Sequence, residues 1–198
     1  MFQPDPWPND VPVPERGGPH FAALVDAIRT VQDAVSGAAR LPDHIATEAT
    51  AALAGVRDLL TPFQGGPLEG VAGTRLDLPG RGHPFLLPFV VEAWSDDRAA
   101  GRVTFTRLHD SGAGASHGGA PPLLFVEVLG RLSNTNRPVA RTAYVTTNFR
   151  QVTPIGRELR LDASVDRIEG RKRYVSGRLR DGDVLIADAE ALFVVPRS

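Results

Sequence analysis

The chain has 198 residues, of which 42% are hydrophobic and 23% are charged, a composition typical of a globular protein with a buried core. Its formal net charge of −1 argues against nucleic acid as a partner, and the lack of cysteine excludes disulfides, thiolate nucleophiles and sulfur-ligated metals. No apolar run is long enough to span a bilayer, and the first residues lack the basic start and apolar core of a signal peptide. We therefore expect a cytoplasmic protein without a membrane partner.

The N-terminal part of the chain divides into three segments. Residues 1–19 are rich in proline and are expected to form an extended arm. Apolar residues with a period near 3.6 predict two amphipathic helices within residues 20–63, which form a helical extension. Glycine and proline recur through residues 64–82 and indicate a linker, which leaves residues 83–198 as the working domain.

The working domain is predicted to be an antiparallel sheet with a single helix, an α+β arrangement. Apolar and polar residues alternate in segments that turn residues separate, and Gly170 and Gly182 follow acidic residues at two expected hairpin turns. The apolar run 123–132 between the second and third strands predicts the helix. The expected strands cover residues 89–94, 102–108, 141–149, 158–168, 173–180 and 184–195.

A glycine turn, Ser116-His117-Gly118-Gly119-Ala120-Pro121-Pro122, lies directly before this helix. Backbone N–H groups at a helix N-terminus are unpaired and carry partial positive charge, so they can hold an anion or polarise a carbonyl as an oxyanion hole does. The alternative is a tight turn in which the histidine only caps or packs.

The order of a strand pair, His-Gly-Gly, a helix and a long meander resembles the hotdog-fold acyl-CoA thioesterases of the PaaI type, over about residues 86–195. The strings that carry the resemblance are "SHGGAPPLLFVEVLG", "TAYVTTNFRQVTPIGRELRLDASV", "EGRKRYVSGRL" and "ADAEALFVV". It implies a hotdog fold, an antiparallel sheet wrapped around one central helix, with the N-terminal helices as an extension. It also implies a homodimer, with a dimer of dimers left open, and an active site at the dimer interface. The expected substrate is a coenzyme A thioester, and no separate cofactor is expected.

In this family the helix start after His117 supplies a backbone N–H, here from Gly118 or Gly119, that polarises the thioester carbonyl. A carboxylate on the helix of the other subunit acts as nucleophile or as base for water. The resemblance implies hydrolysis of acyl-CoA thioesters. The family, however, carries its acid nine residues after the histidine, where this chain has Val126. The next residue, Glu127, points about 100° away on a regular helix.

Three explanations for this departure stay open. The prolines of the first turn could shift the helix register, or the acid could come from elsewhere in the chain. Alternatively, the chain is catalytically impaired, and the protein binds acyl-CoA without cleaving it. The family's asparagine before the histidine is also missing, and Asp110 and Ser111 occupy that region.

Further candidates are weaker. Thr142 lies where related enzymes place a serine or threonine that orients water, although a β-branched residue is equally expected as strand filling. Asn148 could bond the coenzyme A substrate or a neighbouring loop. The phosphates of coenzyme A could be bound by Arg150 and the run Arg171-Lys172-Arg173, because guanidinium matches phosphate geometry. The alternative for this run is a charged, solvated hairpin. The histidines lack metal-ligand spacing, so no metal is expected.

Overall fold

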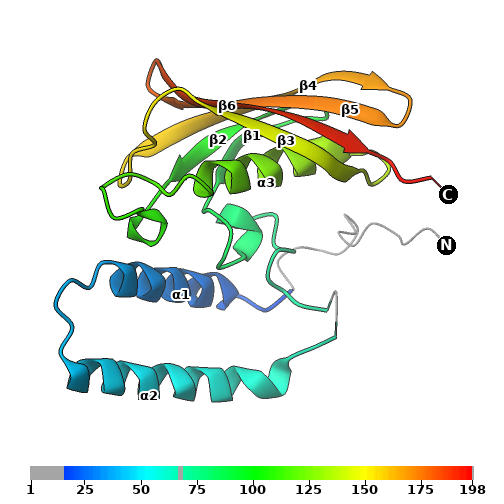
Figure 1. Ribbon diagram of the computed structural model, residues 1–198. Coiled ribbons are helices and arrows are strands. Elements are labelled where there is room, and N and C mark those ends of the chain that lie inside the picture. The colour runs from blue at the N-terminus through cyan, green and yellow to red at the C-terminus, as the bar shows by residue number, and fades with distance from the viewer. Residues whose placement is uncertain (1–15, 67–68, 198) are drawn as a thin grey trace.

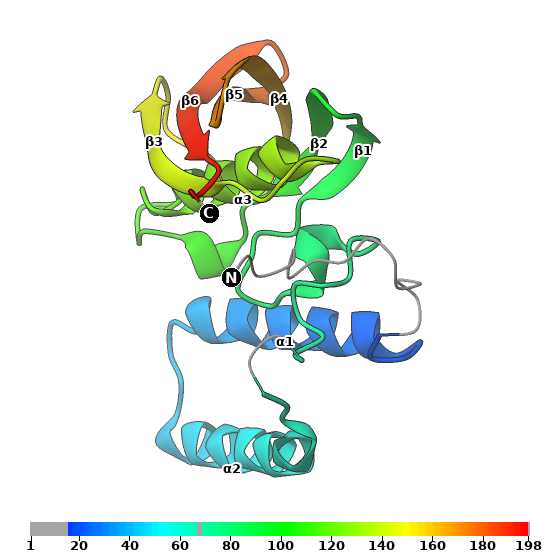
Figure 2. The ribbon, with the colours of Figure 1, turned by 90° about the vertical axis from the view of Figure 1, so that its right-hand side faces the viewer.

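The computed structural model of the chain describes residues 16–66 and 69–197, so most of the predicted N-terminal arm lies outside the described residues. Its main element is an antiparallel sheet of six strands in the order β1-β2-β4-β5-β6-β3. The sheet curves around one long helix, α3, so that the helix lies in its concave side (Figure 2). The strands are β1 (Val90–Trp94), β2 (Arg98–Thr104), β3 (Arg141–Phe149), β4 (Glu158–Glu169), β5 (Lys172–Asp181) and β6 (Val184–Val194).

Most of the predicted strands are confirmed, but the second was placed too late along the chain. β2 spans Arg98–Thr104 and not residues 102–108, because the turn after β1 is tight and Trp94 already pairs with Ala99. The strand ends where Thr106 caps a short 3₁₀ turn, Arg107–His109, with the His109 side chain accepting the Thr106 N–H. The two hairpin glycines expected after β4 and β5 both have φ of 56°, a conformation that favours glycine.

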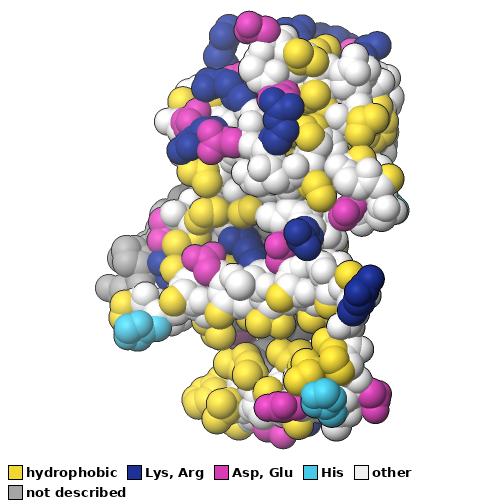
Figure 3. All heavy atoms as spheres, turned by 90° about the vertical axis from the view of Figure 1, so that its left-hand side faces the viewer, with side chains coloured by type: hydrophobic (Ala, Val, Ile, Leu, Met, Phe, Trp, Pro, Cys, Tyr) yellow, Lys and Arg dark blue, Asp and Glu magenta, His cyan; other side chains and the backbone are white. Residues whose placement is uncertain are grey.

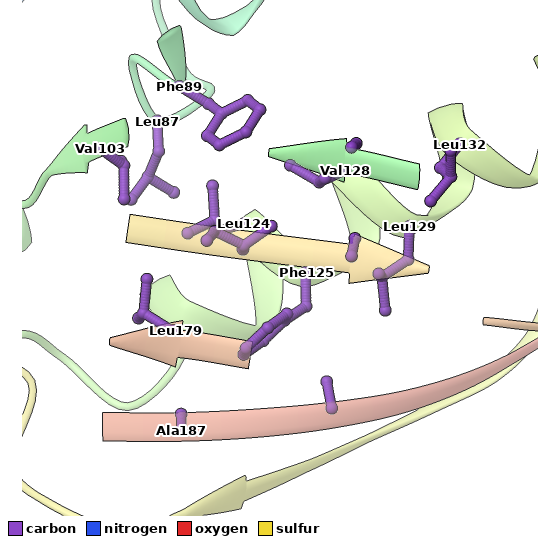
Figure 4. Packing of buried hydrophobic residues seen from close by; sticks show 14 of the residues in the cluster. Leu87, Phe89, Val103, Leu124, Phe125, Val128, Leu129, Leu132, Leu179 and Ala187 are labelled. Atoms are coloured by element: carbon purple, nitrogen blue, oxygen red, sulfur yellow. The ribbon is translucent and has the colours of Figure 1, made fainter. Parts of the chain in front are cut away.

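The core lies between α3 (Ala120–Asn134) and the concave face of the sheet. One face of the helix is buried, and its side chains project toward the strands (Figure 4). Full burial of such a side chain stabilises the fold by about 1.5–3 kcal/mol relative to exposure, so this face holds the helix in the sheet. The opposite face of α3 is not covered by the sheet and carries the residues of the candidate site. The buried side chains of the helix include Leu124, Phe125, Val128, Leu129 and Leu132.

The two predicted N-terminal helices are confirmed as α1 (Phe21–Ser36) and α2 (Asp43–Leu60), which form successive layers below the sheet (Figure 1). Polar side chains of α1 contact segments on either side of the first two strands. The Arg29 guanidinium donates to the carbonyls of Pro79 and His83, and the Asp33 carboxylate accepts the Leu108 N–H.

α2 differs from α1 because it buries none of its residues within the described chain. Its apolar side chains remain exposed, and hydrophobic surface gathers around α1 and α2 at the bottom of the molecule (Figure 3). The amphipathic pattern therefore predicted a helix correctly without predicting what it packs against.

The segment predicted as a linker, residues 64–82, is packed over much of its described length. Arg75 is buried and pairs with Asp77, and the 3₁₀ turn η3 (Pro79–Gly82) contacts both α1 and β1. Among residues 16–66 and 69–197, no helix combines the length and the hydropathy that a membrane crossing requires.

Candidate functional site

The turn before α3 offers fewer free donors than a typical helix N-terminus. The Gly119 N–H donates to Nδ1 of His117 at 3.0 Å, and the Ala120 N–H donates to the His117 carbonyl at 2.9 Å. The next two residues are prolines, which have no N–H. The Gly118 N–H forms no hydrogen bond with any described residue, and both glycines are exposed. The available donor at this helix start is therefore Gly118.

The histidine of this turn is held by the preceding turn. The His117 N–H donates to the His109 carbonyl, and the loop between them is closed by Asp110, whose carboxylate accepts the N–H groups of Gly112 and Gly114. Ser111 donates its hydroxyl to the Ala115 carbonyl. Asp110 and Ser111 thus both have structural contacts within the loop.

Val126 and Glu127 lie on different sides of the uncovered face of α3. The helix runs unbroken from Ala120 with its prolines in the first turn, so its geometry gives no sign of the register shift considered above. The Val126 side chain is 39% exposed, whereas Glu127 is turned toward the packed segment before β1, where Arg81 contacts it.

Arg81 and Glu127 form a two-pronged ion pair, a geometry in which guanidinium and carboxylate fit each other well. Arg81 Nη2 donates to Glu127 Oε2 at 2.9 Å, and Arg81 Nη1 donates to the Gly73 carbonyl at 2.6 Å. Arg81 reaches this position from the η3 turn with φ of 56°, a strained value for a residue with a side chain. The turn therefore fixes the carboxylate that the sequence offered as a catalytic acid.

A cavity of about 400 Å³ lies beside this ion pair. Arg131, one helical turn after Glu127, places its guanidinium over the Trp94 ring at 4.2 Å, and burial lowers its pKa while Glu127 raises it. The indole N–H of Trp94 donates to the Thr135 hydroxyl at 2.9 Å, which fixes the ring. The cavity is lined by Leu76, Arg81, Trp94, Val126, Glu127, Gly130, Arg131, Asn134, Thr135 and Asn136.

The remaining predicted residues are distributed along β3 and its neighbours. Thr142 is exposed near the start of β3, the strand that follows the C-terminal end of α3 in the chain. Asn148 and Arg150, at the other end of the strand, both bind the Asp188 carboxylate, at 3.0 and 2.6 Å. These contacts, led by Arg150, lower the pKa of Asp188.

The basic run in the β4–β5 hairpin contains three different environments. Arg173 is buried, at 4% exposure, and its guanidinium donates to the carbonyls of Ser133, in the last turn of α3, and of Pro138, after the helix. It therefore closes the end of the helix and is not available to a phosphate, which corrects the expectation for this residue. Arg171 donates to the Val195 carbonyl, while Lys172 is exposed. Lys172 is level with the start of β3, since Lys172 and Arg141 both pair with Val194, whereas Arg150 follows the end of β3. Arg150 therefore does not form one site with Arg171 and Lys172 of the same chain.

Sequence reasoning missed Arg81, Trp94 and Arg131. Arg81 lies between glycines in a segment interpreted as a linker, so only its unusual turn could have indicated a fixed role. Glu127 and Arg131 are spaced i, i+4, which predicts an ion pair along the helix. Instead, Glu127 pairs with Arg81, and Arg131 lies over the Trp94 ring. Within residues 16–66 and 69–197, no three metal-binding side chains of the histidine, aspartate or glutamate type come together.

Comparison with solved structures finds the same architecture. A thioesterase superfamily protein is 26% identical, with a TM-score of 0.75 over 88% of this chain and 94% of its own. A Streptococcus mutans protein bound to acetyl CoA is 16% identical, with a TM-score of 0.52 over 55% of this chain and 88% of its own. A thioesterase protein from Streptococcus pneumoniae with coenzyme A is 13% identical, with a TM-score of 0.52 over 56% and 91%. No family model and no curated protein matches the chain.

These similarities show that the chain has the hotdog fold of the thioesterase superfamily. The first of these structures matches 88% of this chain, which is more than residues 83–198 alone. The match therefore also includes much of the helical extension.

Proposed function

We propose that this protein hydrolyses acyl-CoA thioesters. The observation that carries the proposal is the exposed Gly118 N–H, which has no partner among the described residues and lies immediately before α3. Support also comes from the fold, which is shared with a thioesterase superfamily protein, with a protein bound to acetyl CoA and with a thioesterase protein whose structure contains coenzyme A.

The chemistry needs one donor and one base. A water molecule attacks the thioester carbonyl carbon and gives its proton to a carboxylate, for which Glu127 is the candidate. The carbonyl oxygen becomes negative and is stabilised by the Gly118 N–H, a contact typically worth about 3 kcal/mol. When the oxyanion collapses, the C–S bond breaks, and the coenzyme A sulfur takes up the proton to leave a free carboxylic acid.

A complete site requires two copies of the chain. Gly118 and Glu127 are nine residues apart, which corresponds to about 13 Å along the helix, so both cannot act on one carbonyl group from the same chain. Thr142 is near the start of β3, which follows the C-terminal end of α3 in the chain, and we propose that it approaches the donor of the partner copy. We therefore propose a homodimer in which one copy supplies Gly118 and the other supplies the carboxylate. Arg171 and Lys172 stay the proposed contacts for the coenzyme A phosphates.

The donor is tested by a matched pair of substitutions. Gly118→Pro removes the N–H, whereas Gly118→Ala keeps it and adds a methyl group into open space, with no atom within 4 Å. We expect Gly118→Pro to lower kcat for acyl-CoA hydrolysis by about 10²–10³-fold and Gly118→Ala to change it little. Equal rates in the two variants, both folded by thermal unfolding, would contradict the role of this N–H.

A second candidate is acyl-CoA binding without hydrolysis. It is favoured by Val126, which occupies the exposed side of α3 while Glu127 is held by Arg81. Glu127→Gln and Val126→Asp separate the two candidates, since general-base catalysis typically contributes about 10²–10⁴-fold.

If the parent protein hydrolyses acyl-CoA, Glu127→Gln should abolish that activity and Val126→Asp should add little. If the parent only binds acyl-CoA, Val126→Asp should create activity beside the existing donor. Absence of hydrolysis in the parent and both variants, with binding intact, would leave the binding function alone.

A further inference from the structure

The cavity beside α3 contains a charged group whose hydrogen-bonding capacity is unused. Arg131 is half-buried, and its side chain forms no hydrogen bond and no close ion pair with any described residue. A guanidinium has five N–H donors, and leaving them without acceptors away from water costs free energy. The face of the Trp94 ring makes a cation–π contact with the Arg131 guanidinium. This contact provides no oxygen or nitrogen acceptor for the N–H groups.

Other polar groups around the cavity already have partners. Thr135 accepts from Trp94 and donates to the Arg131 carbonyl, at 2.9 and 3.1 Å. The side-chain Oδ1 of Asn134 accepts the Ala140 N–H at 2.8 Å, and the side-chain amide of Asn136 donates to the Asp96 carboxylate at 2.8 Å. No side-chain acceptor of this set is thus directed at the Arg131 guanidinium.

The charge balance of the cavity favours an anion. Two guanidinium groups, those of Arg81 and Arg131, line it together with a single carboxylate, Glu127, which Arg81 engages. The rest of the lining includes apolar surface from Leu76, Trp94 and Val126. A partly apolar cavity with one excess positive charge suits a small molecule that has an apolar body and one negative end.

We propose that this cavity binds the carboxylate of a small aliphatic acid, with Arg131 as its anchor and the apolar body directed toward Val126. The planar guanidinium matches a carboxylate in a two-pronged geometry. The volume of about 400 Å³ falls in the range of small-molecule sites.

The position of the anchor also indicates a substrate class, and this step rests on the proposed function. Arg131 is four residues after Glu127, the proposed base, which corresponds to about 6 Å along the helix. An acyl group whose thioester lies at Glu127 would therefore present its far end to Arg131. The preferred substrates are coenzyme A thioesters of acids that carry a second carboxylate at that far end.

The site is tested without any thioester, by measuring the binding of hexanoate and of hexanamide, which have similar shape and differ in charge. We expect the full chain to bind hexanoate at least about 10-fold more tightly than hexanamide, and Arg131→Gln to remove that difference. Arg57→Gln, on the exposed face of α2, is the matched control and should leave the difference unchanged. Arg131→Lys should restore part of the preference, because it keeps the charge but loses the planar fork.

Equal binding of the two probes by the parent chain would overturn the proposal, whatever the folding of the variants. The same conclusion follows if Arg131→Gln leaves the preference intact or if Arg57→Gln removes it equally.

Turnover of adipyl-CoA and hexanoyl-CoA separates this inference from the proposed function. We expect a higher kcat/KM for adipyl-CoA in the parent and loss of that preference in Arg131→Gln. Hydrolysis of neither thioester together with hexanoate binding would remove the hydrolase and retain the carboxylate site. Equal hydrolysis of both, without preference for hexanoate over hexanamide, would remove the carboxylate site and retain the hydrolase.

Discussion

Arg81, Arg131 and Arg173 carry the same charge, but their surroundings give them different roles. Arg81 holds a carboxylate, Arg131 lies over an aromatic ring beside a cavity, and Arg173 closes the end of a helix. Burial lowers the pKa of Arg131 and of Arg173, yet a guanidinium stays charged at any ordinary pH. The partner of each arginine therefore determines what it does, and its protonation does not.

His109 should make the stability of the protein depend on pH. Burial is the main cause that lowers its pKa from the usual 6.5, against an opposing influence of Asp33, and its Nδ1 accepts the Thr106 N–H only when that nitrogen is unprotonated. Just below pH 6.5 the unfolded chain therefore binds more protons than the folded chain. The free energy of unfolding should rise with pH in this window and fall as the solution is acidified.

Denaturant unfolding between pH 5 and 8 measures this dependence. His109→Gln keeps a side-chain acceptor for the cap and removes the titration, so its slope should be shallower than that of the parent. The pKa of His83 is also lowered, mainly by burial, so His83 should account for part of the pH dependence that remains in the variant. A parent slope of opposite sign, or an unchanged slope in the variant, would refute the assignment.

At the scale of elements, Gly101 in β2 allows the start of β1 and the Phe89 ring to approach closely. A Cβ atom at this position would lie 2.2 Å from the Val90 carbonyl oxygen and 2.5 Å from the Phe89 ring. Backbone must therefore move if any side chain is introduced. In α2, by contrast, a Cβ at Gly55 would meet nothing within 4 Å.

The same substitution should have opposite effects at these two glycines. Gly101→Ala is expected to lower the free energy of unfolding by about 1–3 kcal/mol, the usual cost of overpacking. Gly55→Ala removes a helix-destabilising glycine and should lose no stability. Chemical denaturation of both variants provides the comparison, and a neutral Gly101→Ala would show that the strands tolerate the shift.

Sequence patterns predicted elements that depend on local periodicity and failed where distant segments meet. The alternation within residues 158–168 and the glycine turns at Gly170 and Gly182 predicted the meander correctly, because both signals lie within a few residues. The role of Arg81 depends on a left-handed turn that brings it to Glu127, 46 residues away. The burial of Arg173 likewise depends on a helix end from another part of the chain, so its charge suggested solvent or phosphate instead.

At the scale of the whole molecule, β3 is an open edge of the sheet. It is bonded to β6 on one side only, runs over nine residues without proline or lysine, and exposes most of its side chains. Proteins usually protect such an edge, and pairing with a second copy is one way to do so.

Tyr144→Lys tests this edge as the dimer contact. Tyr144 is 49% exposed and lies within β3, so a lysine there places charge in the proposed interface at little cost to the single chain. Light scattering should give a dimer for the parent chain and a shift toward monomer for the variant. Val184→Lys is the matched control, because Val184 is exposed at the start of β6. Tyr174→Lys is unsuitable, because Tyr174 contacts Arg167. A monomeric parent at micromolar concentration would exclude the two-copy site.

The exposed position of α2 has a consequence for how the molecule opens. Its backbone hydrogen bonds can break by local unfolding of one helix, because no buried side chain has to leave the core. Amide protons in α2 should therefore exchange with solvent far faster than those of α3, whose release requires the sheet to open. A protease should cut first near α2 and leave the sheet with its central helix as the resistant fragment.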